Sequence, residues 1–540
     1  MDCEFKLPIQ YVKNKILNDT IIQDLEIYKS YSNIFKDSIL NEEWGKYYSI
    51  DKSFLKQTQK LTLKYKSNEY DIKEFYNIHS NFINEKNFLD KYQYINFERI
   101  KYLNSSVIFM QFLSYYNISS PILSLCSPIF VFIVPFFVLK LKNVPIEIDK
   151  YVELIRDLVS NHSMFKIFDK DVNYNQKISG IMSILFYFFQ IYQNTISCIS
   201  FYKNINHIGN FINNYRTFCN KSISLIDNVN NNCKEFSKYS QFYSSNLNIK
   251  NTFNDILKKF SLILPYENTL SRITQIGLIM TVYHELYHNK IYHDSIEYIN
   301  KLNTFNNDVI TLKQFVINKQ LNKCRYKNDT SIEKMYYLPH INTEMVKNDL
   351  KINNNIILTG PNASGKTTII KSLLMNIIMS QQFGFGCYKS ANIKIYDYFH
   401  SYLNIPDTSD RDSLFQAEAR RCKDILEYIT KNNEKKHFCI FDEIYSGTNP
   451  LDATLCAEIY LKGLSQFKNL DFILTTHYID VCKYFENNKK YKNIKNYKMN
   501  VLIENDVINY NYLIEPGISH VNGGKQILKD LEYPDYLFNL

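Results

Sequence analysis

Residues 360–367 read Gly-Pro-Asn-Ala-Ser-Gly-Lys-Thr and fit the G-x-x-x-x-G-K-[ST] pattern of a loop that binds phosphate groups. An apolar run at 356–358 predicts a buried strand before this loop, and residues 369–374 predict the start of a helix after it. In that context backbone N–H groups and the helix N-terminus can surround phosphate oxygens. The Lys366 ammonium group would reach the outer phosphates, and the Thr367 hydroxyl would hold Mg²⁺. The predicted ATP-binding residues are Gly360, Pro361, Asn362, Ala363, Ser364, Gly365, Lys366, Thr367 and Thr368.

Acidic and imidazole side chains follow two later apolar strands. Residues 437–444 predict a strand that ends at Asp442 and Glu443. Asp442 would bind Mg²⁺ directly or through water, and Glu443 would polarise the attacking water as a general base or an orienting group. A polar turn at 446–452 would touch a nucleotide or a partner subunit, and a further strand ends at His477, which could sense the γ-phosphate. The pattern predicts an ATPase that uses ATP and Mg²⁺, with Glu443 and His477 as catalytic residues.

Three motifs carry a resemblance to a known family. Gly-Pro-Asn-x-x-Gly-Lys, Asp-Glu-Ile-x-x-Gly-Thr-x-Pro and Thr-Thr-His-Tyr resemble the ATPase domain of the MutS mismatch-repair family, a branch of the ABC-type ATPases. Residues 412–419 resemble that family's Ser-Thr-Phe-x-x-Glu-Met signature, and residues 515–528 resemble its Gly-rich closing segment. The resemblance covers about residues 336–540.

The resemblance implies a dimer that acts on DNA. It implies that Ser413 reaches across the dimer, in trans, to the γ-phosphate bound by the partner subunit. A role for Ser413 as the cap of the helix through Ile425 stays open, and both roles could coexist. The implied function is a MutS-like ATP-dependent DNA-binding protein, in which ATP binding and hydrolysis are coupled to DNA clamping in mismatch repair or recombination. The implied partners are DNA and a second MutS-like subunit, in a homodimer or a heterodimer.

The sequence also departs from the family's pattern. Ala363 stands where the family usually has Met, and Thr367 where it usually has Ser, and both residues keep the phosphate chemistry intact. No Phe-x-Glu tripeptide, which reads mispaired bases in the family, occurs before the ATPase domain. We therefore do not expect direct mismatch readout, and the DNA structure that is bound is not identified by the sequence.

The composition sets broad limits on the rest of the chain. An apolar share of 45% in 540 residues is ample for a folded core, and the net charge of +9 permits a polyanionic partner without demanding one. Eleven cysteines lie scattered without a C-x-x-C pair, which predicts reduced thiols and excludes a zinc ribbon. No secretory signal opens the sequence. We expect an intracellular, soluble protein, cytoplasmic or nuclear.

Helical spacing of apolar residues dominates up to about residue 335, and short apolar strands alternate with helices beyond it. The predicted fold is a mainly α-helical N-terminal region followed by an α/β P-loop NTPase domain of ABC/MutS type. The predicted domains are an N-terminal helical region at 1–104, a helical, lever-like core at 105–335 and the ATPase domain at 336–540.

The 19 residues at 121–139 carry no charge and pass the length test for a membrane span. Pro121, Pro128 and Pro135 argue against one straight helix, and a second apolar stretch, 181–190, has only about half the needed length. We expect a buried helical hairpin here. A membrane segment, and with it a membrane-associated ABC-like ATPase without a DNA role, is the alternative interpretation.

An H-E-x-x-H match occurs at His284, Glu285 and His288. On a helix the two histidines would share a face, and Glu285 could act as general base beside a bound Zn²⁺. His293 and Glu297 are the nearest candidates for a third ligand, but neither follows a standard spacing. A structural helix is the favoured interpretation, and a zinc hydrolase is the second alternative function.

Overall fold

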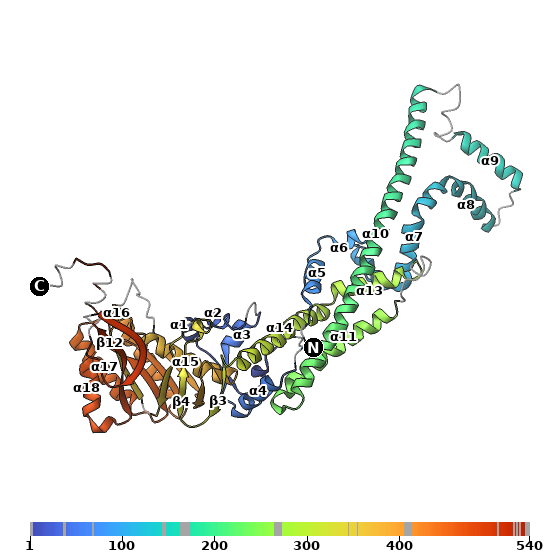
Figure 1. Ribbon diagram of the computed structural model, residues 1–540. Coiled ribbons are helices and arrows are strands. Elements are labelled where there is room, and N and C mark those ends of the chain that lie inside the picture. The colour runs from blue at the N-terminus through green and yellow to red at the C-terminus, as the bar shows by residue number, and fades with distance from the viewer. Residues whose placement is uncertain are drawn as a thin grey trace. The chain divides into compact units, whose positions relative to one another are not determined.

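The computed structural model describes residues 4–35, 39–66, 68, 70–142, 147–161, 173–263, 273–343, 345–353, 355–403, 413–504, 507–521, 524, 528 and 531–534 (Figure 1). The chain forms two compact units. Unit 1 comprises Asp71–Ile223 and Lys250–Glu297, and unit 2 comprises Asp2–Tyr70, Ser224–Ile249 and Tyr298–Leu540. The units thus divide the chain differently from the predicted segments 1–104, 105–335 and 336–540.

Unit 1 is helical throughout its described residues, as the apolar spacing predicted. Its elements, some of which continue into unit 2, are α5 (Lys73–Ile83), α6 (Phe88–Lys91), η2 (Glu98–Ser105), α7 (Val107–Leu125), α8 (Ser127–Leu141), α9 (Ile148–Asn161), α10 (Tyr174–Cys233), α11 (Ser240–Ser261), α13 (Ile276–His288) and α14 (Lys290–Ile317). Aromatic side chains fill its core, with ring centroids of Phe75 and Phe218 only 4.3 Å apart and those of Phe88 and Tyr287 3.8 Å apart. At Gly277, α13 lies so close to α7 that an added Cβ would stand 2.5 Å from the Gln111 nitrogen.

The expectation that residues 121–139 form a buried hairpin is wrong. Helix α7 ends at Leu125 and α8 begins at Ser127, with an 80° bend between them, and α8 has no buried residue among those whose side chains are described. Pro121 and Pro135 lie inside the helices. A charge-free run does not show which part of the protein covers a segment, and here the described residues leave most of it exposed. No individual helix among the described residues combines the length and hydropathy of a membrane span, whereas the bent α7–α8 pair does so jointly.

Unit 2 contains a six-stranded sheet in the order β13-β12-β6-β11-β10-β9. The strands are β6 (Asn355–Thr359), β9 (Tyr398–Tyr402), β10 (His437–Asp442), β11 (Leu470–Thr475), β12 (Ile494–Glu504) and β13 (Val507–Pro516). The neighbours from β9 to β12 pair in parallel, and β13 pairs antiparallel with β12 at one edge. Its helices are α15 (Lys366–Gln382), α16 (Leu414–Lys431), α17 (Pro450–Leu464) and α18 (Ile479–Asn487). The predicted parallel α/β sheet is therefore present.

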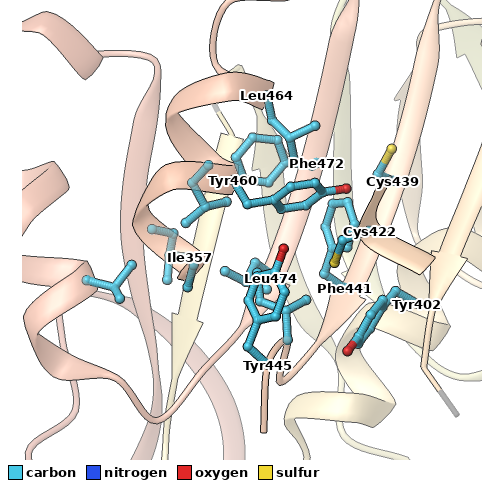
Figure 2. Packing of buried hydrophobic residues seen from close by; sticks show 14 of the residues in the cluster. Ile357, Tyr402, Cys422, Cys439, Phe441, Tyr445, Tyr460, Leu464, Phe472 and Leu474 are labelled. Atoms are coloured by element: carbon cyan, nitrogen blue, oxygen red, sulfur yellow. The ribbon is translucent and has the colours of Figure 1, made fainter. Parts of the chain in front are cut away.

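The core of this sheet lies under α16 and α17. Figure 2 shows Phe441, Phe472 and Leu474 of neighbouring strands packed together with Tyr460 and Leu464 of α17. The strands read as continuous apolar runs because helices and loops cover both faces of a parallel sheet. This packing fixes the ends of β6, β10 and β11 next to one another, and the predicted site residues follow these ends.

Unit 2 also contains strands that the predicted boundary at residue 336 did not anticipate. A five-stranded sheet has the order β5-β4-β8-β3-β7, from β3 (Asn322–Tyr326), β4 (Thr330–Met335), β5 (Asn348–Ile352), β7 (Phe385–Gly386) and β8 (Ser390–Ile393). The other elements of this unit are η1 (Pro8–Tyr11), β1 (Asn14–Ile16), α1 (Asp19–Asp24), α2 (Ile27–Tyr31), α3 (Asn41–Lys46), β2 (Tyr47–Ser49), α4 (Lys52–Lys64), η4 (Ser237–Tyr239), η5 (Leu338–His340) and η6 (Lys489–Tyr491).

The N-terminal segment packs directly on the helix that follows the phosphate-binding loop. Gln382 at the end of α15 donates from Nε2 to the Trp44 carbonyl oxygen at 2.9 Å, and Gln381 donates to the Ser49 carbonyl oxygen at 3.2 Å. Both amides are buried. Residues 4–66 are thus part of the α/β unit rather than a separate helical region.

Candidate nucleotide-binding site

The loop between β6 and α15 is closely packed. Gly365, the N-terminal cap of α15, has φ +90°, and Ala363 has φ +61°, so both adopt the left-handed region that disfavours side chains. A Cβ added at Gly360 would lie 2.8 Å from Ser364 Oγ and 2.9 Å from Met499 Cβ. The loop therefore requires glycine at both motif positions, and α15 begins at Lys366 with its N-terminus at the loop.

The Lys366 side chain is folded into this loop. Its Nζ donates to the carbonyl oxygens of Gly360 at 3.1 Å and Pro361 at 3.3 Å, and it lies 3.4 Å from Glu443 Oε1. Burial lowers the pKa of Lys366, while the negative charges of Glu443 and Asp442 oppose that change. The lysine is thus a buried cation close to the N-terminus of α15, which suits an anionic ligand.

Hydroxyl and carboxylate oxygens converge where β10 and β11 end. Thr367 Oγ1 donates to Asp442 Oδ2 at 2.8 Å, and the Thr475 hydroxyl donates to the other carboxylate oxygen of Asp442. Asp442 and Thr475 are direct partners in the β10–β11 register. Hard oxygen ligands of this kind fit Mg²⁺, which is usually held by one or two protein oxygens together with phosphate and water. The predicted metal residues Thr367 and Asp442 are therefore side by side.

Glu443 and His477 are in contact beside Lys366. His477 Nε2 lies 2.9 Å from Glu443 Oε1 and 3.0 Å from Lys366 Nζ. One ring nitrogen can either donate a hydrogen bond to the carboxylate or accept one from the ammonium group, so the tautomer of the ring decides which bond forms. The hydrogen bond from His477 lowers the pKa of Glu443 against the effect of burial. A half-exposed, ionised carboxylate with one free oxygen is suited to accept a proton from water.

Ser413 caps its own helix. Its Oγ accepts from the Gln416 N–H at 3.3 Å, and the Gln416 side chain accepts from the Ser413 N–H at 3.1 Å, which completes a capping box at the start of α16. Ser413 does not line the cavity at the phosphate-binding loop of its own chain. The cap that the sequence left open is present, and the trans role remains a prediction; Asp412 lies outside the described residues.

Glu418 is a structural residue to which the sequence assigned no role. Its buried carboxylate accepts from Ser446 N at 3.1 Å, Ser446 Oγ at 2.8 Å and Gly447 N at 3.1 Å. These bonds join α16 to the loop that leads to Asn449, which caps α17. The glutamate in the signature motif could have indicated this structural role, because a carboxylate on an apolar helix face needs several hydrogen-bond donors.

A cavity of about 690 Å³ opens beside the loop. Besides residues of the loop and Glu443, it is lined by Tyr336, Tyr337, His340 and Tyr512. Asn348 holds the Tyr512 backbone in place, since its Nδ2 donates to the Tyr512 carbonyl oxygen at 3.0 Å. Aromatic rings next to a phosphate-binding loop can stack on a nucleotide base. The sequence did not predict these residues, because no spacing links Tyr512 to the loop.

The H-E-x-x-H residues lie in unit 1, on α13. The ring centroids of His284 and His288 are 4.4 Å apart, but the Glu285 carboxylate accepts from Tyr292 at 3.1 Å and pairs with a lysine. His293 contacts the Tyr287 carbonyl oxygen at 2.9 Å. Across the described ranges no three His, Cys, Asp or Glu side chains, Glu297 included, are grouped as ligands. The arrangement gives the zinc hydrolase, the second alternative function, no support.

Comparison with known proteins finds relatives of the C-terminal region. The family model described as MutS domain V matches residues 356–539. DNA mismatch repair protein MutS of Acholeplasma laidlawii is 29% identical over 195 residues, which cover 36% of this chain and 22% of that protein. The MutS protein of Prochlorococcus marinus strain AS9601 is 31% identical over 190 residues, 34% of this chain and 20% of the relative, and that of Petrotoga mobilis is 27% identical over 274 residues, 47% and 32%.

The matched region spans about a fifth to a third of the length of these relatives. Within it lie the phosphate-binding loop, Asp442, Glu443 and His477, which the sequence motifs had singled out. The C-terminal α/β region of this chain is therefore similar to domain V of the MutS family.

Proposed function

We propose that this chain is a MutS-like ATPase that binds ATP with Mg²⁺ in the cavity beside residues 360–367 and hydrolyses it. The observation that carries the proposal is the convergence of Lys366, Thr367, Asp442 and Glu443, which come from two separate parts of the sequence. Each has the chemistry that one part of a nucleoside triphosphate requires.

Phosphate binding would follow from the loop. The Lys366 ammonium group donates hydrogen bonds to two backbone carbonyl oxygens and forms an ion pair with Glu443. Phosphate oxygens carry more negative charge than carbonyl oxygens and would bind the ammonium group more strongly. The Ser364 hydroxyl is buried and has no hydrogen-bond partner within the part of the chain that the structure describes, so it can donate to a phosphate oxygen. The rings of Tyr337 and Tyr512 would stack on the nucleotide base.

Hydrolysis would depend on Glu443. In the proposed reaction its free carboxylate oxygen takes the proton of the attacking water, while His477 holds the other oxygen in place. Thr475 fixes the backbone at this point, because its carbonyl oxygen accepts from the Glu443 N–H at 3.1 Å. Thr367 and Asp442 would hold Mg²⁺, which supplies positive charge for the phosphate oxygens.

We further propose that the ATPase acts as a dimer and on DNA. Ser413, at the exposed start of α16, would complete the nucleotide site of a partner subunit, and Thr448 and Asn449 would line the same seam. DNA binding rests on the named role of the relatives in DNA mismatch repair and on the net charge of +9. A binding panel of homoduplex, mismatch and junction DNA, with and without ATP, tests this part.

The ATPase proposal is tested with two substitutions and a control. Lys366→Ala should abolish tight ATP binding because it removes the charge that faces the outer phosphates. Glu443→Gln should bind ATP normally and turn it over at least about a hundredfold more slowly, because the amide cannot accept the proton. Lys29→Ala removes an exposed lysine of the same unit and should change neither quantity. Full turnover by Glu443→Gln would refute the catalytic assignment.

A further inference from the structure

The longest uncharged stretches in unit 1 form an exposed apolar surface. No Asp, Glu, Lys or Arg occurs between Val107 and Leu139 or between Ile178 and Tyr202. The first stretch forms α7 and most of α8, and the second lies within α10 (Figure 1). Their large apolar side chains are mostly exposed, among them Ile108, Phe112, Ile133, Phe137, Leu185 and Phe186. We call these exposed side chains the apolar surface.

Helix α7 has an inverted distribution of polarity. Its buried residues are Met110, Ser114, Ser120 and Ser124, whereas its larger aliphatic and aromatic side chains mostly point outward. A helix on the surface of a water-soluble domain buries its apolar stripe and exposes its polar one. The serine hydroxyl groups donate to carbonyl oxygens of their own helix, with Ser114 Oγ 2.6 Å from the Met110 carbonyl oxygen. Such a helix needs no water for its hydroxyl groups.

The contacts between α7 and α10 have the same character. Asn194 donates to Ser124 Oγ, Tyr187 OH donates to the Leu125 carbonyl oxygen at 2.8 Å, and Cys198 Sγ lies 3.5 Å from the Ile118 carbonyl oxygen. Polar and small side chains therefore lie between the helices, and apolar ones face away from them. Helices packed within lipid show this arrangement, because lipid gives apolar side chains no reason to turn inward.

Helix α8 indicates what surrounds the apolar surface. Ile129, Phe130 and Val138, which at about 100° per residue are spread over roughly half of the circumference of the helix, are 54%, 45% and 44% exposed. Figure 1 shows α8 turning away from α10 after the bend. A protein partner would cover one face of such a helix, whereas acyl chains would cover all of them. Lys140 and Lys142 follow at its end, where they suit the phosphates of lipid headgroups.

The dimensions favour insertion from one side over crossing. At about 1.5 Å per residue α8 is roughly 22 Å long, which is less than the hydrocarbon core of about 30 Å. The 80° bend turns α8 away from the direction of α7. We propose that α7, α8 and residues 178–202 of α10 insert into one leaflet of a lipid bilayer. This proposal is independent of the ATPase, whose site lies in unit 2.

A flotation assay with phosphatidylcholine vesicles tests the proposal. The full chain should float with the vesicles, and the double variant Ile133→Asp/Phe137→Asp should remain at the bottom of the gradient with at least a tenfold loss of bound protein. The matched control Leu63→Asp/Ile317→Asp changes two exposed aliphatic side chains of unit 2 and should float like the unaltered chain. Retained helicity of both double variants, measured by circular dichroism, shows that they fold.

A fluorescence measurement locates the contact. Trp44 is the only tryptophan and is buried in unit 2, so Phe137→Trp adds one exposed reporter. Its emission should shift to shorter wavelength when vesicles are added. A chain that stays at the bottom of the gradient with an unshifted spectrum overturns the proposal. A second result would also overturn it. If the chain does not float and light scattering finds an oligomer that is absent in the α8 double variant, the apolar surface is a protein interface.

Discussion

Replacing Glu418 by glutamine should loosen the connection between α16 and the loop at 446–447. One carboxylate oxygen accepts both bonds from Ser446, and the other accepts the bond from Gly447. An amide keeps the shape of the side chain but has one accepting oxygen. In the variant the Gly447 N–H, or the two donors of Ser446, would therefore face an NH₂ group in a buried position.

The size of the effect follows from these three bonds. A buried donor that loses its acceptor costs about 1–3 kcal/mol, so Glu418→Gln should lower the free energy of unfolding by about that amount. Glu418→Ala leaves all three donors without an acceptor and should cost about 3–5 kcal/mol. Because the loop leads to the cap of α17, we also expect ATP turnover to fall more than ATP affinity.

Urea denaturation followed by circular dichroism measures the change. The matched control is Glu427→Gln on the same helix, where the carboxylate is half exposed and lies 3.6 Å from Lys423. Exposed pairs of this kind contribute little, so the control should stay within about 0.5 kcal/mol of the unaltered protein. Equal midpoints and slopes for Glu418→Gln and Glu427→Gln would show that the three bonds do not stabilise the fold.

Three further outcomes are expected. Gly360→Ala should abolish ATP binding in a titration, because the added Cβ would lie 2.8 Å from Ser364 Oγ. The control Gly463→Ala, which has open space around its Cβ, should bind ATP normally. Equal ATP affinities of the two variants would contradict the packing argument. Burial lowers the pKa of His79 to about 3, so the unfolded state binds more protons below the ordinary 6.5 and stability falls as pH drops. His79→Phe should make that fall shallower in denaturation at several pH values, and an unchanged slope would rule this cause out. Mixing Lys366→Ala with Ser413→Arg subunits should restore about half the ATPase activity, since one composite site stays whole; verified mixed dimers without recovery would remove the trans role.

The sequence was sufficient to predict which side chains meet at the candidate site. Asp442 is the last residue of its strand, Lys366 and His477 come after the ends of theirs, and motifs of fixed spacing mark all three strands. Parallel strands bring their carboxyl ends to one edge, so the contacts among these residues follow once the strands are recognised. The contact of Thr367 with Asp442 could be anticipated in this way.

The features that the sequence did not predict depend on contacts between distant segments. The sequence did not predict β3 and β4, which precede residue 336, because they pair with β8 and β5 farther along the chain. The exposure of α8 was missed because an uncharged run has the same composition whether protein, lipid or nothing covers it. Tyr512 enters the cavity only because β13 adds to the far edge of the sheet.

The contacts of α15 with the N-terminal segment determine which part of the chain can fold as an independent unit. A fragment cut at residue 336, where the sequence placed a boundary, would lack Trp44 and Ser49. It would leave the buried amides of Gln381 and Gln382 without these acceptors and would uncover the end of α15. Since the same helix begins at Lys366, we expect the smallest autonomous unit that carries the candidate site to be discontinuous in sequence and to include the segment with Trp44 and Ser49.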